Sequence, residues 1–150
     1  MKMVNGLVIQ GHAVASGKGK DARYPDGTLR LQAPFFLEGG LDINRFYTGT
    51  INLDVSPYTF EIRRPKYFFR EIKWSPFIPP ENFYFFDLIA YYRDEEYEGL
   101  IYMPDPKTKT DHFQDTQMIE LLLPELQDLN YGDKLKIRVP NDQLRFFKTV

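Results

Sequence analysis

Three residues with oxygen-bearing side chains alternate with apolar residues in the segment Thr50–Val55, at a spacing suited to binding a metal ion. The segment has the period of a strand, so Thr50, Asn52 and Asp54 share one face, with neighbours roughly 7 Å apart. Hydroxyl, amide and carboxylate oxygens are the hard ligands that Mg²⁺ accepts, usually together with water and substrate phosphates. On spacing alone, a solvated strand face is the simpler interpretation.

A second polar segment, a loop from Gly11 to Gly27, follows the first apolar run and contains glycines and lysines. Backbone amides at glycines can approach an anion closely, and Lys18 and Lys20 could neutralise phosphate charge. The segment is not a Walker A loop, because Gly17-Lys18 is followed by Gly19 instead of Ser or Thr. A lysine-containing surface loop is the alternative.

A polar stretch near residue 112 offers acid–base chemistry. His112 follows Asp111, and a histidine beside an acid can act as a general base because its pKa is near neutrality. The same stretch can equally cap a helix. His12 and Asp54 are further candidates by chemistry alone, so the sequence assigns no general base.

Composition limits the function classes. The chain has 150 residues, which fits one domain, and 16% of them are aromatic, which favours strands. The net charge of −2 argues against nucleic acid or an anionic membrane as a partner. The sequence has no Cys, which excludes disulfides and thiolate chemistry. No apolar run approaches a membrane span or a signal core, so we expect a cytoplasmic protein.

The elements that must position these residues are mostly strands. Period-two patterns predict strands at Leu7–Ile9, Thr28–Gln32, Thr50–Val55, Tyr58–Ile62, Phe68–Trp74, Phe83–Tyr92, Leu100–Met103 and Leu135–Val139. One short helix is expected from apolar residues at helical spacing, with Asp115 or Thr116 as N-cap and Pro124 weakening it: Ile119, Leu122, Leu123 and Leu126. Many strands with one helix suggest a closed β-barrel.

Several short motifs occur in a fixed order along the chain. They are Gly49-Thr50-Ile51-Asn52-Leu53, Gly99-Leu100-Ile101-Tyr102-Met103-Pro104, Met118-Ile119-Glu120-Leu121-Leu122-Leu123-Pro124 and Tyr131-Gly132-Asp133-Lys134-Leu135-Lys136-Ile137-Arg138-Val139. Together they resemble the archaeal CTP-dependent riboflavin kinases over nearly the whole chain. The resemblance implies a mainly β fold, a single six-stranded cradle-loop barrel with one or two short helices. It also implies transfer of a phosphoryl group from CTP to riboflavin, giving FMN.

The resemblance assigns roles to individual residues. The family's metal ligands fall on Thr50 and Asn52, which would hold Mg²⁺. The family's flavin contacts fall on Glu120 and on Thr108, with Thr110 as the alternative for the latter. The implied chemistry is metal-assisted phosphoryl transfer, which depends on positioning and charge neutralisation.

The nucleotide-binding segments depart from the family pattern. The family's glycine-rich loop falls on Gly11-His12-Ala13-Val14-Ala15, where alanines replace two of three glycines, and Lys18 and Lys20 lie farther along. The family's basic stretch after the helical segment is here the acidic segment 125–128, which would repel a triphosphate. Two hypotheses follow: a riboflavin kinase, or a non-catalytic flavin- or nucleotide-binding barrel without a triphosphate site.

Overall fold

A computed structural model of the chain describes residues 2–9, 28–47, 49–105 and 117–148. This part of the chain is mainly β, as the aromatic and β-branched composition favours. The strands are β1 (Lys2–Ile9), β2 (Ile51–Asp54), β3 (Tyr58–Ile62), β4 (Tyr67–Ile72), β5 (Glu81–Tyr92), β6 (Glu95–Pro104), β7 (Met118–Leu122), β8 (Lys134–Val139) and β9 (Leu144–Lys148). The helical segments are α1 (Thr28–Glu38) and the 3-10 turn η1 (Ile43–Arg45).

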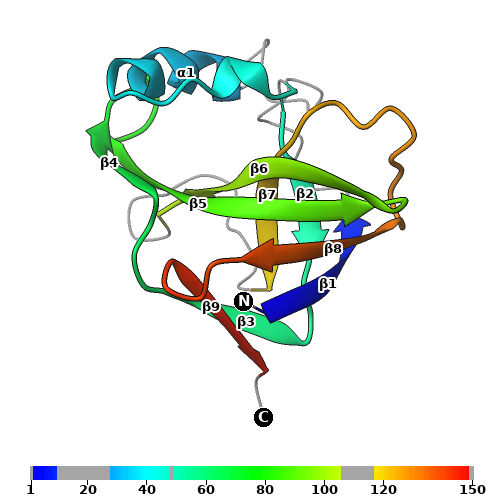
Figure 1. Cartoon of the computed structure of the whole chain (residues 1–150). Coiled ribbons are helices and arrows are strands. Elements are labelled where there is room, and N and C mark those ends of the chain that lie inside the picture. Colours follow the sequence, from blue (N-terminus) through cyan, green and yellow to red (C-terminus); the bar gives the residue numbers. More distant parts are fainter. Residues whose placement is uncertain (1, 10–27, 48, 106–116, 149–150) are drawn as a thin grey trace.

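Six strands form a closed antiparallel barrel in the order β5-β6-β7-β2-β1-β8, and β8 pairs back onto β5 (Figure 1). Closure depends on the length of β5. Its first half pairs with β4, where Phe85 lies opposite Tyr67, and its second half pairs with β8, where Ala90 lies opposite Ile137. The mainly β fold and the six-stranded barrel expected from the sequence are therefore confirmed.

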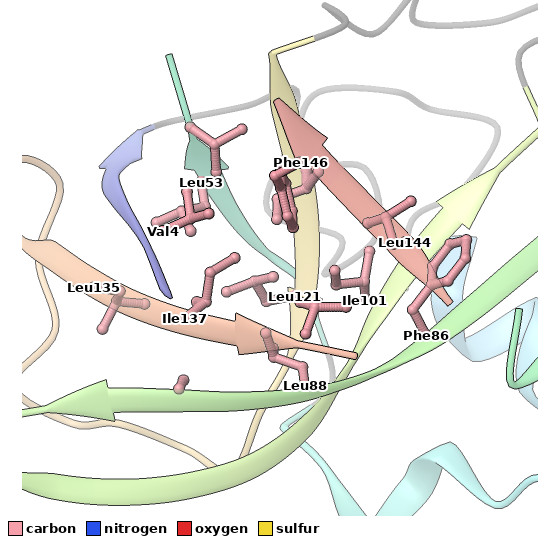
Figure 2. Close-up of a cluster of buried hydrophobic side chains, with 14 of the residues drawn as sticks. Val4, Leu53, Phe86, Leu88, Ile101, Leu121, Leu135, Ile137, Leu144 and Phe146 are labelled. Carbon is pink, nitrogen blue, oxygen red and sulfur yellow. The ribbon is translucent and has the colours of Figure 1, made fainter. Parts of the chain in front are cut away.

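The barrel interior is filled by one apolar core. Because successive strand residues point to opposite faces, every second residue of the barrel strands reaches this interior. Figure 2 shows the side chains converging from strands all around the barrel. The labelled members are Val4, Leu53, Phe86, Leu88, Ile101, Leu121, Leu135 and Ile137 from the barrel, with Leu144 and Phe146 from β9. Each such side chain, fully buried, stabilises the fold by about 1.5–3 kcal/mol.

A second core lies outside the barrel, between α1 and the outer surface of β4, β5, β6 and β7. Its centre is Phe36 of α1, which is fully buried. The ring centroid of Phe36 lies 5.1 Å from that of Phe69, 5.2 Å from Phe83 and 5.0 Å from Phe85. Part of the sheet is thus buried on both faces. Strands in this part are expected to show apolar runs in the sequence instead of alternating apolar and polar residues.

The two-stranded sheet of β3 and β9 covers the barrel on the side opposite α1 (Figure 1). Phe60 of β3 and Phe146 of β9 are cross-strand partners, with ring centroids 6.2 Å apart in an edge-to-face arrangement. Phe146 and Leu144 also belong to the interior core. The sequence patterns predicted β3 but not β9.

The strand predicted at Thr28–Gln32 is wrong, because these residues begin α1. As a strand, Leu29 and Leu31 would share one face; in the helix, Leu29 is buried and Leu31 is exposed. The buried residues of α1 recur at helical spacing: Thr28, Leu29, Gln32, Ala33 and Phe36. Pro34 lies inside this helix and lacks an N–H donor.

The helix predicted over Ile119, Leu122, Leu123 and Leu126 is also wrong, because Met118–Leu122 forms β7. Ile119 and Leu121 point into the barrel, whereas Leu122 packs in the outer core. A strand buried on both faces shows an apolar run instead of strict alternation, and such a run is not distinguishable from a buried helix by periodicity. Glu120 consequently lies in a strand and not at a helix start.

Tight turns connect neighbouring strands. Arg93 and Asp94 form a two-residue hairpin turn between β5 and β6, with φ of 50° and 64°. Another turn contains Gly132, where the Asp133 amide donates to the Asn130 carbonyl at 3.1 Å. None of the helices in the described part of the chain combines the length and apolar character needed to cross a bilayer.

Candidate functional site

The pairing of β2 with β7 brings together three residues that the sequence singled out. Asn52 lies directly opposite Glu120 in the antiparallel register. The Thr50 hydroxyl donates a hydrogen bond to Glu120 Oε1 at 2.9 Å. A hydroxyl, an amide and a carboxylate from segments far apart in the sequence therefore form one polar cluster.

The strand pleat directs this cluster to the outer face of the barrel. Leu53 and Ile119 flank Asn52 and Glu120 along their strands, and both are fully buried in the interior core. Because side chains alternate along a strand, Asn52 and Glu120 must point outward. Their exposure is intermediate, so the cluster is accessible from solvent.

Gly49 controls how the chain enters β2. It has a φ of 151°, a backbone conformation that residues with a Cβ rarely adopt. Just before it, the Tyr47 amide donates to the Leu123 carbonyl at 3.0 Å, which attaches this segment to the end of β7. The position of Thr50 is thus fixed by backbone contacts on both sides.

A cavity of about 340 Å³ adjoins the cluster, at the end of β1, the start of β2 and the segment after β7. Thr50 and Asn52 line it together with Glu125, Gln127 and Tyr131. We call it the first cavity. Its volume falls within the usual range for small-molecule sites.

Backbone hydrogen bonds hold the far wall of the first cavity against β1. The Gly132 amide donates to the Val8 carbonyl at 2.7 Å, and the Val8 amide donates to the Asp133 carbonyl at 2.8 Å. Gly132 has a φ of 92°, which the tight turn requires. Tyr131, whose side chain is exposed, is carried at the cavity margin by this turn.

Tyr102 adjoins the cluster on the other side, opposite Glu120 in the β6–β7 register. Its hydroxyl donates to Gln32 Oε1 of α1 at 2.5 Å. Burial, followed by the negative charges of Glu120 and Glu81, raises the pKa of Tyr102 well above its ordinary value. Tyr102 is therefore a neutral hydrogen-bond donor that links α1 to the strand carrying Glu120. The sequence patterns gave no sign of this role, because only the register places Tyr102 beside Glu120.

Asp54 has a different role from its two strand neighbours. Its Oδ1 accepts hydrogen bonds from the Ser56 amide at 2.9 Å and from the Ser56 hydroxyl at 2.6 Å. Asp54 does not line the first cavity. It stabilises the turn between β2 and β3.

The donor set of the cluster fits Mg²⁺ on one condition, that substrate phosphates and water complete the coordination. The Thr50 hydroxyl donates its hydrogen bond to Glu120, which leaves the lone pairs of the hydroxyl oxygen available to a cation. Asn52 adds an amide on the same face. Within the described ranges, no group of three His, Cys, Asp or Glu side chains could hold a metal unaided.

The acidic segment noted in the sequence borders the first cavity. Glu125 and Gln127 line it, whereas Asp128 forms an ion pair with Arg93 at 3.3 Å. Among the described residues of the cavity wall, Glu125 is the one acid, where a triphosphate site would favour a base.

The remaining site residues expected from the sequence lie outside the described residues. They are Gly11, His12, Ala13, Lys18, Lys20 and Thr108, with the alternatives Thr110 and His112. The structure thus brings together Thr50, Asn52 and Glu120. Comparison with protein-family models gave no match, and comparison with curated proteins gave none either.

Proposed function

We propose that the protein is a phosphotransferase of the riboflavin-kinase type, which transfers the terminal phosphoryl group of a nucleoside triphosphate to riboflavin and forms FMN. One observation carries the proposal. Thr50, Asn52 and Glu120, the residues to which the resemblance assigns the metal and the flavin, lie within one cluster beside a small-molecule-sized cavity. Because these residues are far apart in the sequence, only the fold brings them together.

The first cavity is the proposed donor site. Its wall includes the segment after β7, which corresponds in the resemblance to the stretch that holds the nucleotide. The exposed ring of Tyr131 offers a surface on which a base could stack, and Gln127 and Asn130 supply amide groups. CTP is the donor that the resemblance favours.

Thr50 and Asn52 would hold Mg²⁺ between the cluster and the donor phosphates. When bound, the ion would neutralise charge on those phosphates. The protein contributes orientation, because the β2–β7 register fixes both side chains relative to the first cavity.

Glu120 is the proposed contact to the acceptor. A carboxylate accepts hydrogen bonds from a hydroxyl or ring N–H of the flavin. In the reaction, the acceptor hydroxyl oxygen forms a bond to the terminal phosphorus, the bond to the leaving nucleoside diphosphate breaks, and the hydroxyl proton passes to solvent.

The alternative is a binding barrel that keeps the flavin site and does not transfer phosphate. The Glu125 side chain in the wall of the first cavity favours this alternative, because a carboxylate there repels a triphosphate. The two functions differ in whether FMN is formed.

The test is incubation with riboflavin, Mg²⁺ and each nucleoside triphosphate in turn, with FMN separated chromatographically. The proposal expects FMN with at least one donor. Thr50→Ala and Asn52→Ala should each lower the rate by at least about tenfold, equivalent to about 1.4 kcal/mol of transition-state stabilisation. Asn5→Ala makes the same change as Asn52→Ala at an exposed position of β1, and should leave the rate unchanged.

Absence of FMN with every donor, while riboflavin fluorescence is still quenched on binding, would reject the kinase and support the binding barrel. Full activity of Thr50→Ala and Asn52→Ala would contradict the proposal that these residues hold Mg²⁺. A gain of activity in Glu125→Gln would locate the triphosphate at the first cavity.

A further inference from the structure

A second cavity of about 250 Å³ lies between η1 and the outer surface of β5, β6 and β8. It shares no lining residue with the first cavity. Two arginines line it from different elements: Arg45 from η1 and Arg138 from β8. Both charges thus face one small volume outside the proposed phosphotransfer site.

Arg138 has an unsatisfied donor. Its Nε atom is buried, and within the described part of the chain it has no hydrogen-bond partner. Its guanidinium carbon lies 5.9 Å from the ring centroid of Tyr91, a contact that orients the group but does not satisfy an N–H. Buried donors are normally paired, and an acceptor in the cavity could reach this N–H only if the Arg138 side chain moved.

Arg45 lines the same cavity from η1. Its guanidinium carbon lies 4.6 Å from the ring centroid of Phe46, which also lines the cavity. Stacking on an aromatic ring leaves the N–H edge of a guanidinium available for hydrogen bonding. Among the described residues, neither Arg45 nor Arg138 forms an ion pair, in contrast to Arg93 and Arg145.

Two acids also line the cavity, and among the described residues neither forms an ion pair with Arg45 or Arg138. Gln143 engages Asp87 twice: its Nε2 donates to Asp87 Oδ2 at 2.8 Å, and its Oε1 accepts from the Asp87 amide at 2.8 Å. Glu98 is exposed to solvent, as is Arg45, so the charges of both are screened. The acids offset part of the positive charge, but they leave the guanidinium N–H groups that face the cavity to a ligand.

We propose that the second cavity binds the carboxylate or phosphate group of a small molecule between Arg45 and Arg138. A planar guanidinium matches either oxyanion through paired N–H donors, and two guanidiniums from different elements can engage one oxyanion together. The site is independent of the proposed kinase activity, because it shares no residue with the phosphotransfer cluster.

The test is a titration of the ¹⁵N-labelled protein with inorganic phosphate and, separately, with acetate, at constant ionic strength set by chloride. The readout is the arginine Nε–Hε resonances, with that of Arg138 assigned through Arg138→Lys. The Arg138 resonance should shift saturably with at least one anion, whereas that of Arg145 should not. Saturation by phosphate alone identifies a phosphate ligand, and saturation by acetate alone a carboxylate ligand.

Variants supply the second arm. Arg138→Gln and Arg45→Gln should each raise the dissociation constant by at least about tenfold, the effect of losing one charged hydrogen bond. Arg145→Gln makes the same change at an exposed arginine paired with Glu61, and should leave affinity unchanged. Thr50→Ala should also leave it unchanged, which separates this site from the first cavity. If Arg138→Gln does not fold, the dissociation constant of Arg45→Gln and the titration of the Arg138 resonance in the wild type still test the proposal.

The proposal is overturned if the Arg138 resonance does not move with either anion, or moves linearly in parallel with Arg145. It is also overturned if Arg45→Gln binds as tightly as the wild type, or if Thr50→Ala abolishes the binding. Each of these results is compatible with an active kinase, so the two proposals fail separately.

Discussion

Thr50 and Glu120 are joined across β2 and β7 by a hydrogen bond of 2.9 Å from the threonine hydroxyl to the carboxylate. The bond sits beside the pair Asn52 and Glu120, which are direct cross-strand neighbours in the register. A slip of one residue between β2 and β7 would turn these side chains to the other face. The cluster therefore exists only in the observed register of β2 and β7.

The bond between Thr50 and Glu120 can be measured by a double-mutant cycle with Thr50→Val and Glu120→Gln. Valine keeps the shape of threonine and removes its hydroxyl. We expect a coupling free energy of about 0.5–1.5 kcal/mol in urea unfolding, the net value of a part-buried hydrogen bond. The cycle isolates this bond from the other contacts of Glu120. Additive effects of the two substitutions would show that the bond does not contribute to stability.

Gly99 permits the close approach of β6 to β7. A Cβ at this position would collide with the Leu122 carbonyl oxygen and lie 2.6 Å from Leu123 Cδ2. Because the carbonyl belongs to the backbone, the strands must move apart, and Gly99→Ala should lower the free energy of unfolding by about 1–3 kcal/mol. The measurement is urea unfolding followed by tryptophan fluorescence.

Gly132→Ala is the control for this substitution. Gly132 has a φ of 92°, but no atom of the described residues lies within 4 Å of the position that a Cβ would take. Its replacement tests conformational strain without a collision. The urea concentration at the unfolding midpoint should be lower for Gly99→Ala than for Gly132→Ala. The reverse order would contradict the steric explanation.

Phe36 anchors α1 to the barrel. Phe36→Ala removes the ring that contacts Phe69, Phe83 and Phe85, and should cost about 3–5 kcal/mol. Leu37→Ala, next in the same helix and 52% exposed, should change stability by less than about 0.5 kcal/mol. Amide hydrogen exchange should show faster exchange in α1 for Phe36→Ala. Equal effects of the two substitutions would mean that α1 is not held by this ring.

Tyr102 should make stability fall at alkaline pH. In the unfolded chain its pKa is near the ordinary value of 10.0, and burial together with Glu120 and Glu81 raises the folded value well above this. Between these two pKa values the unfolded state has lost a proton that the folded state retains. The free energy of unfolding therefore decreases as pH rises, by about 1.4 kcal/mol per pH unit, and is unaffected by this group at lower pH.

Urea unfolding between about pH 9 and pH 11 checks this linkage. Tyr102→Phe should be less stable at neutral pH, because Gln32 loses its donor, but its stability should fall less steeply with pH. A residual slope is expected, since the pKa values of Tyr84, Tyr92 and Tyr97 are also raised. Identical slopes for the wild type and Tyr102→Phe would contradict the assignment.

Strands buried on one face were predictable from the sequence. In Thr50–Val55 and Tyr58–Ile62, apolar and polar residues alternate, because one side of each strand meets the core and the other meets solvent. The same alternation is sufficient to place Thr50 and Asn52 on one face of their strand. The barrel class followed from the number of such segments and the lack of long helical patterns.

Elements in contact with both cores were not predictable in this way. Met118–Leu122 is covered by the barrel interior on one side and by the outer core on the other, so its apolar run carried no period. Thr28–Gln32 alternates by chance, and its helical face became evident only with Phe36, which packs against residues more than thirty positions away. β9 was missed although Leu144 and Phe146 alternate, since its interior contacts come from distant strands.

The sequence by itself determined the residue types of the candidate site and the face that Thr50 and Asn52 share, because local strand periodicity is a short-range property. Only the tertiary structure decided that Glu120 lies opposite Asn52 and that Tyr102 adjoins it. These relationships depend on strand order and register, which are set by burial of both cores together. No local segment of the chain encodes the strand order or the register.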